Sequence, residues 1–276
     1  MIRVAVVGHV EWIEFARVDR VPGPGEIVHA VETWEEAAGG GAVAAVQLAK
    51  LAGGCLFLTA LGDDELGRRA KSELERRRVR VEAAWRHKPQ RKAFVHIDGR
   101  GERTITVIGD RLAPRREDDL PWDELASVDA LYLTAGNAEA VSAARAARTL
   151  VATVRDIEPL KAASVQIDAL VSSSRDRGER YMPGTLHLPP RLVVRTAGAD
   201  GGTVTGAGGG GFDWEAAPLP GPAVDAYGSG DSFAAGLTYG LGDGRSPADA
   251  VALGARCGAA SITGRGPYEA QLTDPG

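Results

Sequence analysis

Several patterns that mark common protein classes are missing from this sequence. Its two cysteines, Cys55 and Cys257, stand in apolar surroundings, which favours buried, reduced thiols over a disulfide or a metal site. The five histidines show no metal-ligand spacing. No segment approaches the length of a membrane span, and the first residues lack the apolar run and cleavage site of a signal peptide. We therefore expect a cytoplasmic protein without a membrane-embedded part.

Two further absences concern nucleic acids and phosphates. The formal net charge is -5 and acids are interspersed with bases, so nucleic acid is not an expected partner. The sequence G-x-x-x-x-G-K-[ST], which cradles phosphates in P-loop kinases, does not occur. The dinucleotide pattern G-x-G-x-x-G occurs at 206–211, but the helix that pyrophosphate binding requires does not follow it. We interpret 206–211 as a turn between two strands and not as the mark of a dehydrogenase.

What the sequence does contain is an alternation of strand and helix patterns. The apolar run 4–7 ends at Gly8 and is typical of a strand buried on both faces of a parallel sheet. Such an alternation predicts a parallel sheet with helices on both faces. No repeat or linker divides the chain, so we expect a single domain, 1–276. The other expected strands are 55–60, 130–134, 151–154, 169–172 and 192–196, and the expected helices are 42–51, 64–78, 138–150 and one capped by Ser246.

Other stretches favour strands that are not followed by helices. Residues 9–15 alternate between apolar and polar side chains, and 26–34 is expected to return as a second strand. Strands at 93–97 and 103–107 flank Asp98-Gly99, a dipeptide typical of tight hairpin turns.

One stretch near the C-terminus has the chemistry of an anion site. Gly228-Ser229-Gly230-Asp231 leads into an apolar helical pattern, which predicts a tight turn that opens a helix. The first N–H groups of a helix have no internal partner, and small residues let an anion approach them. Asp is also one of the commonest helix caps, so Asp231 by itself fits either a capping or a catalytic role.

Six segments, in matching order, resemble motifs of the PfkB (ribokinase-like) carbohydrate kinase family. The most specific is Asp-x-x-Gly-x-Gly-Asp-x-Phe-x-x-Gly, which runs from Asp225 to Gly236. The other five are Pro24-Gly25-Glu26, Ala38-Gly39-Gly40-Gly41-Ala42, Gly62-Asp63-Asp64-Glu65-Leu66-Gly67, Gly101-Glu102-Arg103-Thr104-Ile105 and Thr196-Ala197-Gly198-Ala199-Asp200-Gly201.

This resemblance implies both a fold and a reaction. The fold would be a three-layer α/β/α arrangement with a mostly parallel central sheet and a small β lid built from about 9–35 and 79–108. ATP would donate a phosphoryl group, with Mg²⁺ offsetting its charge, to a hydroxylated small molecule under the lid. Asp231 would be the general base, and the N–H groups of Gly228, Ser229 and Gly230 would bind the transferring phosphoryl group.

The resemblance also implies binding residues. Those expected to contact the substrate are Glu11, Gly39, Gly40, Gly41, Val43 and Arg103. Those expected to contact the nucleotide are Ser173, Asp176, Thr196, Gly198, Gly201 and Asp225. No direct metal ligand is indicated, although Asp176 could hold the ion through water.

The chain departs from the family mainly at the substrate end. Where relatives commonly have Asn-x-Asp after the first strand, this chain has Glu11-Trp12-Ile13, and the usual Asn of the Gly-Gly signature is Val43. Strand alternation puts Glu11 and Ile13 on one face, so Glu11 either reaches the pocket or is a solvated strand residue. A pocket without two polar ligands disfavours ribose or fructose and favours a hydroxyl on a more apolar body, such as a nucleoside or a hydroxymethyl-bearing metabolite.

Two further hypotheses concern activity and assembly. The family's Asn-x-x-Glu motif, which lies near the metal and phosphates, reads Ser173-Ser174-Arg175-Asp176 here. The alternative to a kinase is therefore a catalytically weak member that binds a nucleotide or metabolite as a sensor or regulator. A homodimer through the lid is expected if apolar lid residues such as Trp12 and Phe15 are exposed.

Overall fold

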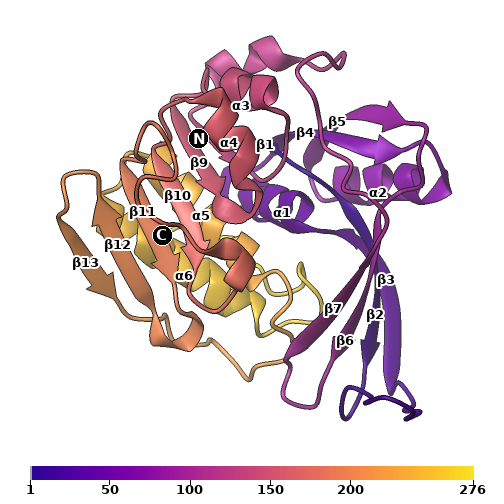
Figure 1. The fold of residues 1–276 in the computed structure, drawn as a ribbon. Helices are drawn as coiled ribbons and strands as arrows, with labels where there is room; N and C mark the ends of the chain where they lie inside the picture. Colours follow the sequence, from indigo (N-terminus) through magenta and orange to yellow (C-terminus); the bar gives the residue numbers. More distant parts are fainter. Residues whose placement is uncertain (1) are drawn as a thin grey trace.

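The apolar runs in the sequence lie side by side in one nine-stranded sheet (Figure 1). A computed structural model describes residues 2–276. The strand order is β13-β12-β11-β10-β9-β8-β1-β4-β5, parallel from β11 to β5, with β12 and β13 antiparallel at one edge. The bounds are β1 Val4–Val7, β4 Cys55–Gly62, β5 Val79–Arg86, β8 Ala130–Leu133, β9 Thr149–Thr153, β10 Ala169–Ser173, β11 Leu192–Thr196, β12 Gly202–Gly206 and β13 Gly211–Trp214.

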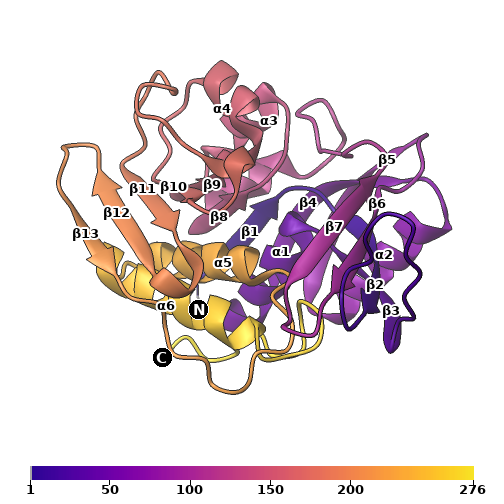
Figure 2. The same ribbon diagram turned by 60° about the horizontal axis from the view of Figure 1, so that its bottom comes forward.

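Helices cover both faces of this sheet, and strand alternation supplies a core to each face. In β1, Val4 and Val6 belong to the core shared with α1, α2, α5 and α6, whereas Ala5 and Val7 belong to the core shared with α3 and α4. Figure 2 shows α5 and α6 on one side of the sheet and α3 and α4 on the other. The bounds are α1 Gly40–Ala52, α2 Glu65–Arg76, α3 Ala138–Ala144, α4 Ile157–Ala163, α5 Ser229–Gly242 and α6 Pro247–Ser261. The three-layer prediction is confirmed.

A second sheet of four strands projects from this body (Figure 1). Its order is β3-β2-β6-β7, with bounds β2 Glu11–Arg17, β3 Glu32–Ala38, β6 Lys92–Ile97 and β7 Arg103–Ile108. The strands β6 and β7 form the hairpin expected around Asp98-Gly99. The small sheet expected beside the large one is therefore present.

Three expected boundaries were wrong. Strand β5 pairs with β4 in the large sheet because Val79 and Val81 join its core, so the small sheet does not include 79–86. The returning strand begins at Glu32 and not at residue 26. Helix α3 ends at Ala144, since the Arg145 guanidinium instead bonds carbonyl oxygens of the following turn, and β9 then begins at Thr149.

The prediction that Trp12 and Phe15 are exposed on the small sheet was also wrong. Trp12 and Phe15 are each only 1% exposed. The Phe15 ring stacks on Trp34, with centroids 4.7 Å apart, and meets the Tyr227 ring edge-on. The face of β2 that carries Phe15 therefore packs against the body, and sequence alternation could not show which partner covers it.

Two other predictions were confirmed, those for the cysteines and for residues 206–211. Cys55 and Cys257 are buried free thiols, and burial raises the pKa of each. The glycines at 206–211 turn the chain between β12 and β13. Across residues 2–276, no helix combines the length and apolar character that crossing a bilayer demands.

The close packing of α5 on α6 generates a stability prediction. A Cβ added at Gly240 would lie 2.7 Å from Ala250 Cα and 2.9 Å from its Cβ, and a backbone neighbour cannot move aside cheaply. Gly240→Ala should therefore lower the free energy of unfolding by about 1–2 kcal/mol, because overpacking outweighs the gain in helix propensity. Gly208→Ala, where nothing lies within 4 Å, is the control for urea denaturation. Equal stability of the two variants would contradict the packing argument.

Candidate functional site

The predicted Gly-Ser-Gly-Asp turn does open a helix. Gly228 caps α5 with a φ of 79°, in the left-handed region that favours glycine. A Cβ there would also press on Pro267 and on Val43, 3.0 Å from each. At Gly230 an added Cβ would meet nothing within 4 Å, so this part of the turn faces open space. The N–H of Gly230 is therefore accessible to an anion, whereas the N–H of Ser229 makes a long bond of 3.5 Å to the Ala226 carbonyl.

The carboxylate of Asp231 lies between the N-termini of two helices. It belongs to the first turn of α5, and its Oδ1 would be only 2.8 Å from a Cβ added at Gly40, the first residue of α1. Burial, followed by the negative charge of Glu179, raises the pKa of Asp231 to about 6, against the opposing influence of Arg155 and Arg103. The side chain nevertheless keeps part of its surface open. This combination of a raised pKa and an exposed edge suits proton acceptance.

Asp225, expected among the nucleotide contacts, is fully buried. Its Oδ1 accepts a hydrogen bond from the Tyr227 N–H at 2.8 Å, and its Oδ2 accepts one from the Gly266 N–H at 3.0 Å. The carboxylate thus joins the start of the turn to the segment after α6. In this structure Asp225 fixes the shape of the turn.

The substrate-side residues predicted from the resemblance divide into two groups. Gly39, Gly40 and Gly41 lie where β3 meets α1, close to His9 and Glu11. Val43 and Ile13 are fully buried, and Val43 packs beneath Gly228. They therefore do not supply the more apolar pocket that the sequence led us to expect.

Glu11 is also buried, with 7% of its surface exposed, which excludes the solvated alternative. Its Oε1 is 2.7 Å from Arg91 Nε and 3.9 Å from His9 Nε2. The contact with Arg91 lies off the N–H direction, so it is an ion pair without good hydrogen-bond geometry. Burial raises the pKa of Glu11, and Arg91 opposes that shift.

Sequence reasoning missed a group of charged side chains beside Glu11. We call Arg91, Arg111 and Arg155 the arginine cluster. Arg111 Nη1 is 3.6 Å from Asp156, and Arg155 Nη2 is 2.7 Å from Asp176 and 2.5 Å from Glu179.

The buried His9 lies next to this cluster. Burial lowers its pKa, and the positive charges of Arg111, Arg91 and Arg155 lower it further. His9 follows β1 and Arg155 follows β9, so both stand at the carboxyl edge of the large sheet, where ligands of such sheets commonly bind. The arginines come from segments far apart in the sequence, and no spacing could have grouped them.

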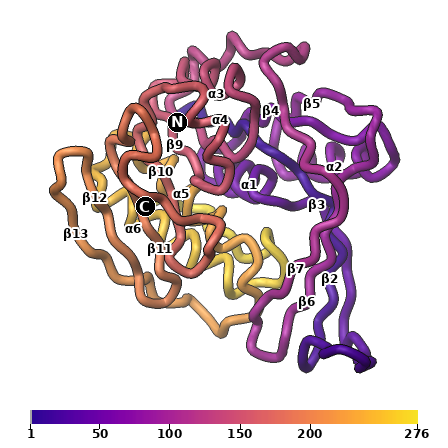
Figure 3. The backbone as a smooth tube through the Cα atoms, viewed as in Figure 1, coloured from indigo at the N-terminus to yellow at the C-terminus, as the bar shows by residue number. Residues whose placement is uncertain are grey.

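The small sheet is fastened to the turn before α5. The loop from β13 to α5 runs toward the β6–β7 hairpin (Figure 3). There the Ala226 N–H donates to the Gly101 carbonyl at 3.1 Å, and Arg103 Nη1 donates to the Ala226 carbonyl at 2.7 Å. Arg17 Nη1 donates to the Val224 carbonyl at 3.2 Å. Arg103, expected to contact substrate, therefore holds the turn that carries Asp231.

Apart from Asp225, the expected nucleotide residues lie at the ends of β10 and β11 or just after them, at the same edge of the sheet. Ser173 Oγ accepts from the N–H groups of Arg175 and Asp176, and Asp176 Oδ1 accepts from the Gly178 N–H. Thr196 Oγ1 donates to the Ser172 carbonyl. The Arg175 guanidinium covers Gly198, and Gly201 packs against the Trp214 carbonyl. A hollow of about 450 Å³ adjoins them, lined by Ala197, Asp200, Gly202, Thr203, Asp213, Trp214 and Glu215.

Comparison with known proteins gives one family for the whole chain. The model of the "pfkB family carbohydrate kinase" matches residues 1–172 and 173–274. A ribokinase of Dictyostelium discoideum is 29% identical over 108 residues, which cover 38% of this chain and 34% of that protein. An ATP-dependent ribose-1-phosphate kinase of Halopiger xanaduensis is 28% identical over 265 residues, covering 86% of this chain and 84% of that protein. The Arabidopsis thaliana ribokinase, solved with ribose and ATP, has a TM-score of 0.74 at 20% identity, covering 98% and 95% of the two chains.

The raised pKa of Asp231 predicts a cost in stability that depends on pH. Its ordinary value is 3.8, so between about pH 4 and pH 6 the folded state binds more protons than the unfolded state, and stability falls as pH rises. Asp231→Asn should therefore raise the free energy of unfolding by on the order of 2 kcal/mol at pH 7, and the gain should vanish near pH 4. Urea denaturation across this range tests it, with Asp19→Asn as the exposed control. A gain that is the same at both pH values would contradict the assigned burial of the charge.

Proposed function

Because the chain belongs to the pfkB family of carbohydrate kinases, we propose that it transfers the terminal phosphoryl group of ATP to a hydroxyl of a sugar or nucleoside. The observation that carries this proposal is the position of Asp231, in the first turn of α5 and directly opposite the first residue of α1. A carboxylate with a raised pKa thereby lies beside free helix N–H groups.

Each part of this arrangement has a task in phosphoryl transfer. The N–H groups of Gly228, Ser229 and Gly230 would stabilise the charge on the equatorial phosphoryl oxygens. The acceptor oxygen bonds to the γ-phosphorus while the bond to the β–γ bridging oxygen breaks and ADP leaves. Asp231 takes the proton of the acceptor hydroxyl, and a pKa of about 6 leaves it mostly ionised at neutral pH.

The nucleotide would lie along the ends of β10 and β11. The hollow beside Ala197, Asp200 and Trp214 is lined in part by sequence neighbours of the predicted residues Thr196, Gly198 and Gly201. The Arabidopsis relative was solved with ATP, which supports ATP as the donor. A donor of this kind also supports our expectation of a cytoplasmic protein.

Magnesium fits the side chains near the proposed phosphates. In kinases, Mg²⁺ is held by phosphates, waters and one or two carboxylates, so a ready cage of three acidic or imidazole ligands is not required. Within residues 2–276 no such cage occurs, but Asp176 and Glu179 place two carboxylates on one short segment after β10. They would hold Mg²⁺ directly or through water, and the ion would offset the triphosphate charge.

A sensor or regulator is the second candidate, and the two ion pairs of Arg155 favour it. This guanidinium engages both Asp176 and Glu179, which leaves less carboxylate charge for a metal ion. ATP binding without turnover would favour this candidate over the kinase.

The kinase proposal predicts the effect of removing the base. With Mg-ATP and a panel of sugars, sugar phosphates and nucleosides, Asp231→Asn should lower kcat by about 10²–10⁴-fold, because no carboxylate then accepts the proton. The wild-type kcat/KM should fall as pH drops below about 6, where Asp231 is protonated in the free enzyme. Coupled detection of ADP measures both, with Asp19→Asn as control. Substrate-dependent ADP release that survives Asp231→Asn would contradict the role given to Asp231.

We further propose that two copies of the chain associate through the small sheet. Strand β7 ends this sheet, pairs there with β6, and exposes Ile105, Val107 and Ile108. An edge strand with apolar side chains is a template for pairing with another strand, and a second copy offers the same edge. Val107→Lys should shift the protein toward the monomer in sedimentation velocity, whereas Met182→Lys, exposed elsewhere, should not. A wild-type monomer would rule this association out.

A further inference from the structure

The arginine cluster lies where the small sheet leaves the body. Arg91 immediately precedes β6 and Arg111 follows β7 by three residues, so both stand at the base of the same hairpin. Arg155 reaches the same region from the end of β9. Three cationic side chains thus lie near His9 and Glu11.

One of these cations, Arg111, is poorly compensated. The Arg111 side chain is 27% exposed, and Asp156, its ion-pair partner, is 3.6 Å away, beyond hydrogen-bond distance. Its Nε is buried and has no acceptor within residues 2–276. Burial, followed by the charge of Arg91, lowers the pKa of Arg111, whereas Asp156 and Glu11 oppose that shift.

Most guanidinium N–H donors of Arg91 and Arg111 have no acceptor among the described residues. A guanidinium carries five N–H donors. Among the described residues, the Arg91 side chain forms an ion pair with Glu11 alone, and the Arg111 side chain forms one with Asp156 alone. Both guanidinia can therefore accept a further anion without losing these partners.

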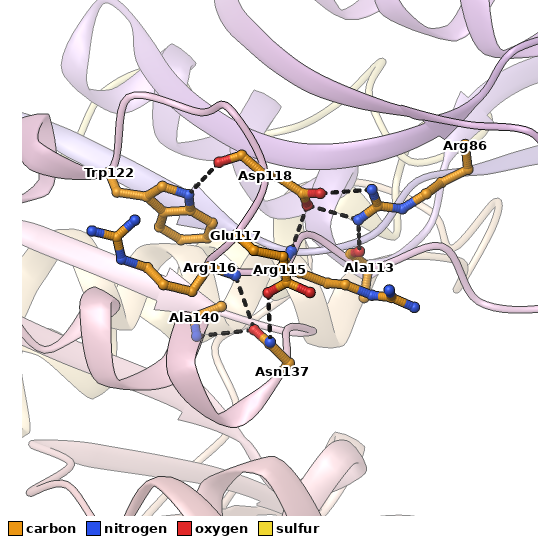
Figure 4. A network of polar contacts seen from close by, with 9 residues as sticks. All are labelled: Arg86, Ala113, Arg115, Arg116, Glu117, Asp118, Trp122, Asn137 and Ala140. Atoms are coloured by element: carbon orange, nitrogen blue, oxygen red, sulfur yellow. Dashed lines mark hydrogen bonds and ion pairs between the residues drawn. The ribbon is translucent and has the colours of Figure 1, made fainter.

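Hydrogen bonds fix the segment that follows Arg111. The segment that follows it is clamped by Arg86, which donates to both carboxylate oxygens of Asp118 at 2.7 Å and to the Ala113 carbonyl at 2.9 Å (Figure 4). The Arg116 N–H adds a bond to Asn137 Oδ1. The backbone that follows Arg111 is fixed in this way, and an anionic ligand would supply negative charge to the partly buried guanidinium.

The cluster and Asp231 are within reach of one small molecule. A Cβ added at Gly40 would lie 2.8 Å from Asp231 Oδ1 and 3.6 Å from His9 Cε1. His9 lies beside Glu11, and Glu11 contacts Arg91. One glycine therefore borders both the proposed base and the edge of the cluster.

We propose that the acceptor is a sugar phosphate whose phosphate binds to Arg91 and Arg111 while its free hydroxyl lies at Asp231. This inference rests on the proposed kinase function and specifies its substrate class. Arginine forks bind phosphate with two parallel hydrogen bonds, and a dianion suits several neighbouring cations better than a carboxylate does. The hydroxyl oxygen bonds to the γ-phosphorus of ATP while the bond from that phosphorus to the β–γ bridging oxygen breaks, and the hydroxyl proton passes to Asp231. The products are a sugar bisphosphate and ADP.

Binding without ATP tests this proposal separately from catalysis. Calorimetry would compare ribose, ribose 1-phosphate, ribose 5-phosphate, fructose 6-phosphate and gluconate on the wild type, Arg111→Gln and Arg111→Lys. At least one sugar phosphate should bind tenfold or more tightly than ribose. Arg111→Gln should abolish that preference and Arg111→Lys should keep part of it, because the charge remains but the fork is lost. Arg191→Gln, at the opposite edge of the sheet, should match the wild type.

The outcomes separate this inference from the kinase proposal. Asp231→Asn should keep the preference for sugar phosphate while losing turnover, since the base does not hold the phosphate. Equal binding of ribose and the sugar phosphates, tighter binding of gluconate, no binding of any probe, or a preference unchanged in a folded Arg111→Gln would each overturn the inference. Turnover of neutral sugars alone would overturn it and leave the kinase proposal standing. Thermal melting checks that each variant is folded.

Discussion

The meeting of two helix N-termini at Asp231 is the constraint on which the site depends. A carboxylate is tolerated there because helix dipoles favour negative charge, yet burial and Glu179 disfavour it, and the balance raises the pKa of Asp231 to about 6. Glycine at position 40 permits this approach, because a Cβ there would displace the carboxylate of Asp231 from its present position. The charged carboxylate of Asp231 therefore serves the proposed function but lowers the stability of the fold.

The turn before α5 joins this centre to the rest of the molecule. Asp225 ties it to the segment after α6, Tyr227 packs on the small sheet, and Ala226 bonds to the β6–β7 hairpin. A movement of the small sheet would thus act on the same turn that supplies the anion-binding N–H groups. The sheet contributes to the geometry of the site besides covering it.

The sequence predicted the elements whose signal is local. Apolar runs predicted most of the strands of the large sheet, and Gly-Ser-Gly-Asp predicted the opening of α5. It could not assign β5 to a sheet, because Val79 and Val81 alternate as they would in either one. It predicted exposure of Trp12 and Phe15, whose covering partners are distant in the chain. The arginine cluster was invisible for the same reason, since only the fold brings Arg91, Arg111 and Arg155 together.

The cluster changes how the departures from the family are understood. From the sequence, Ile13 and Val43 indicated a loss of polar ligands and hence a more apolar acceptor. Both are buried packing residues, while the side chains beside Glu11 are charged. A protein that had only lost its substrate would gain stability by also losing a poorly paired, partly buried arginine. Arg111 lies in a segment fixed by Arg86 and Asp118, and its partly buried charge lowers the stability of the fold. This loss of stability favours a site specialised for an anionic acceptor over a site that has lost its function.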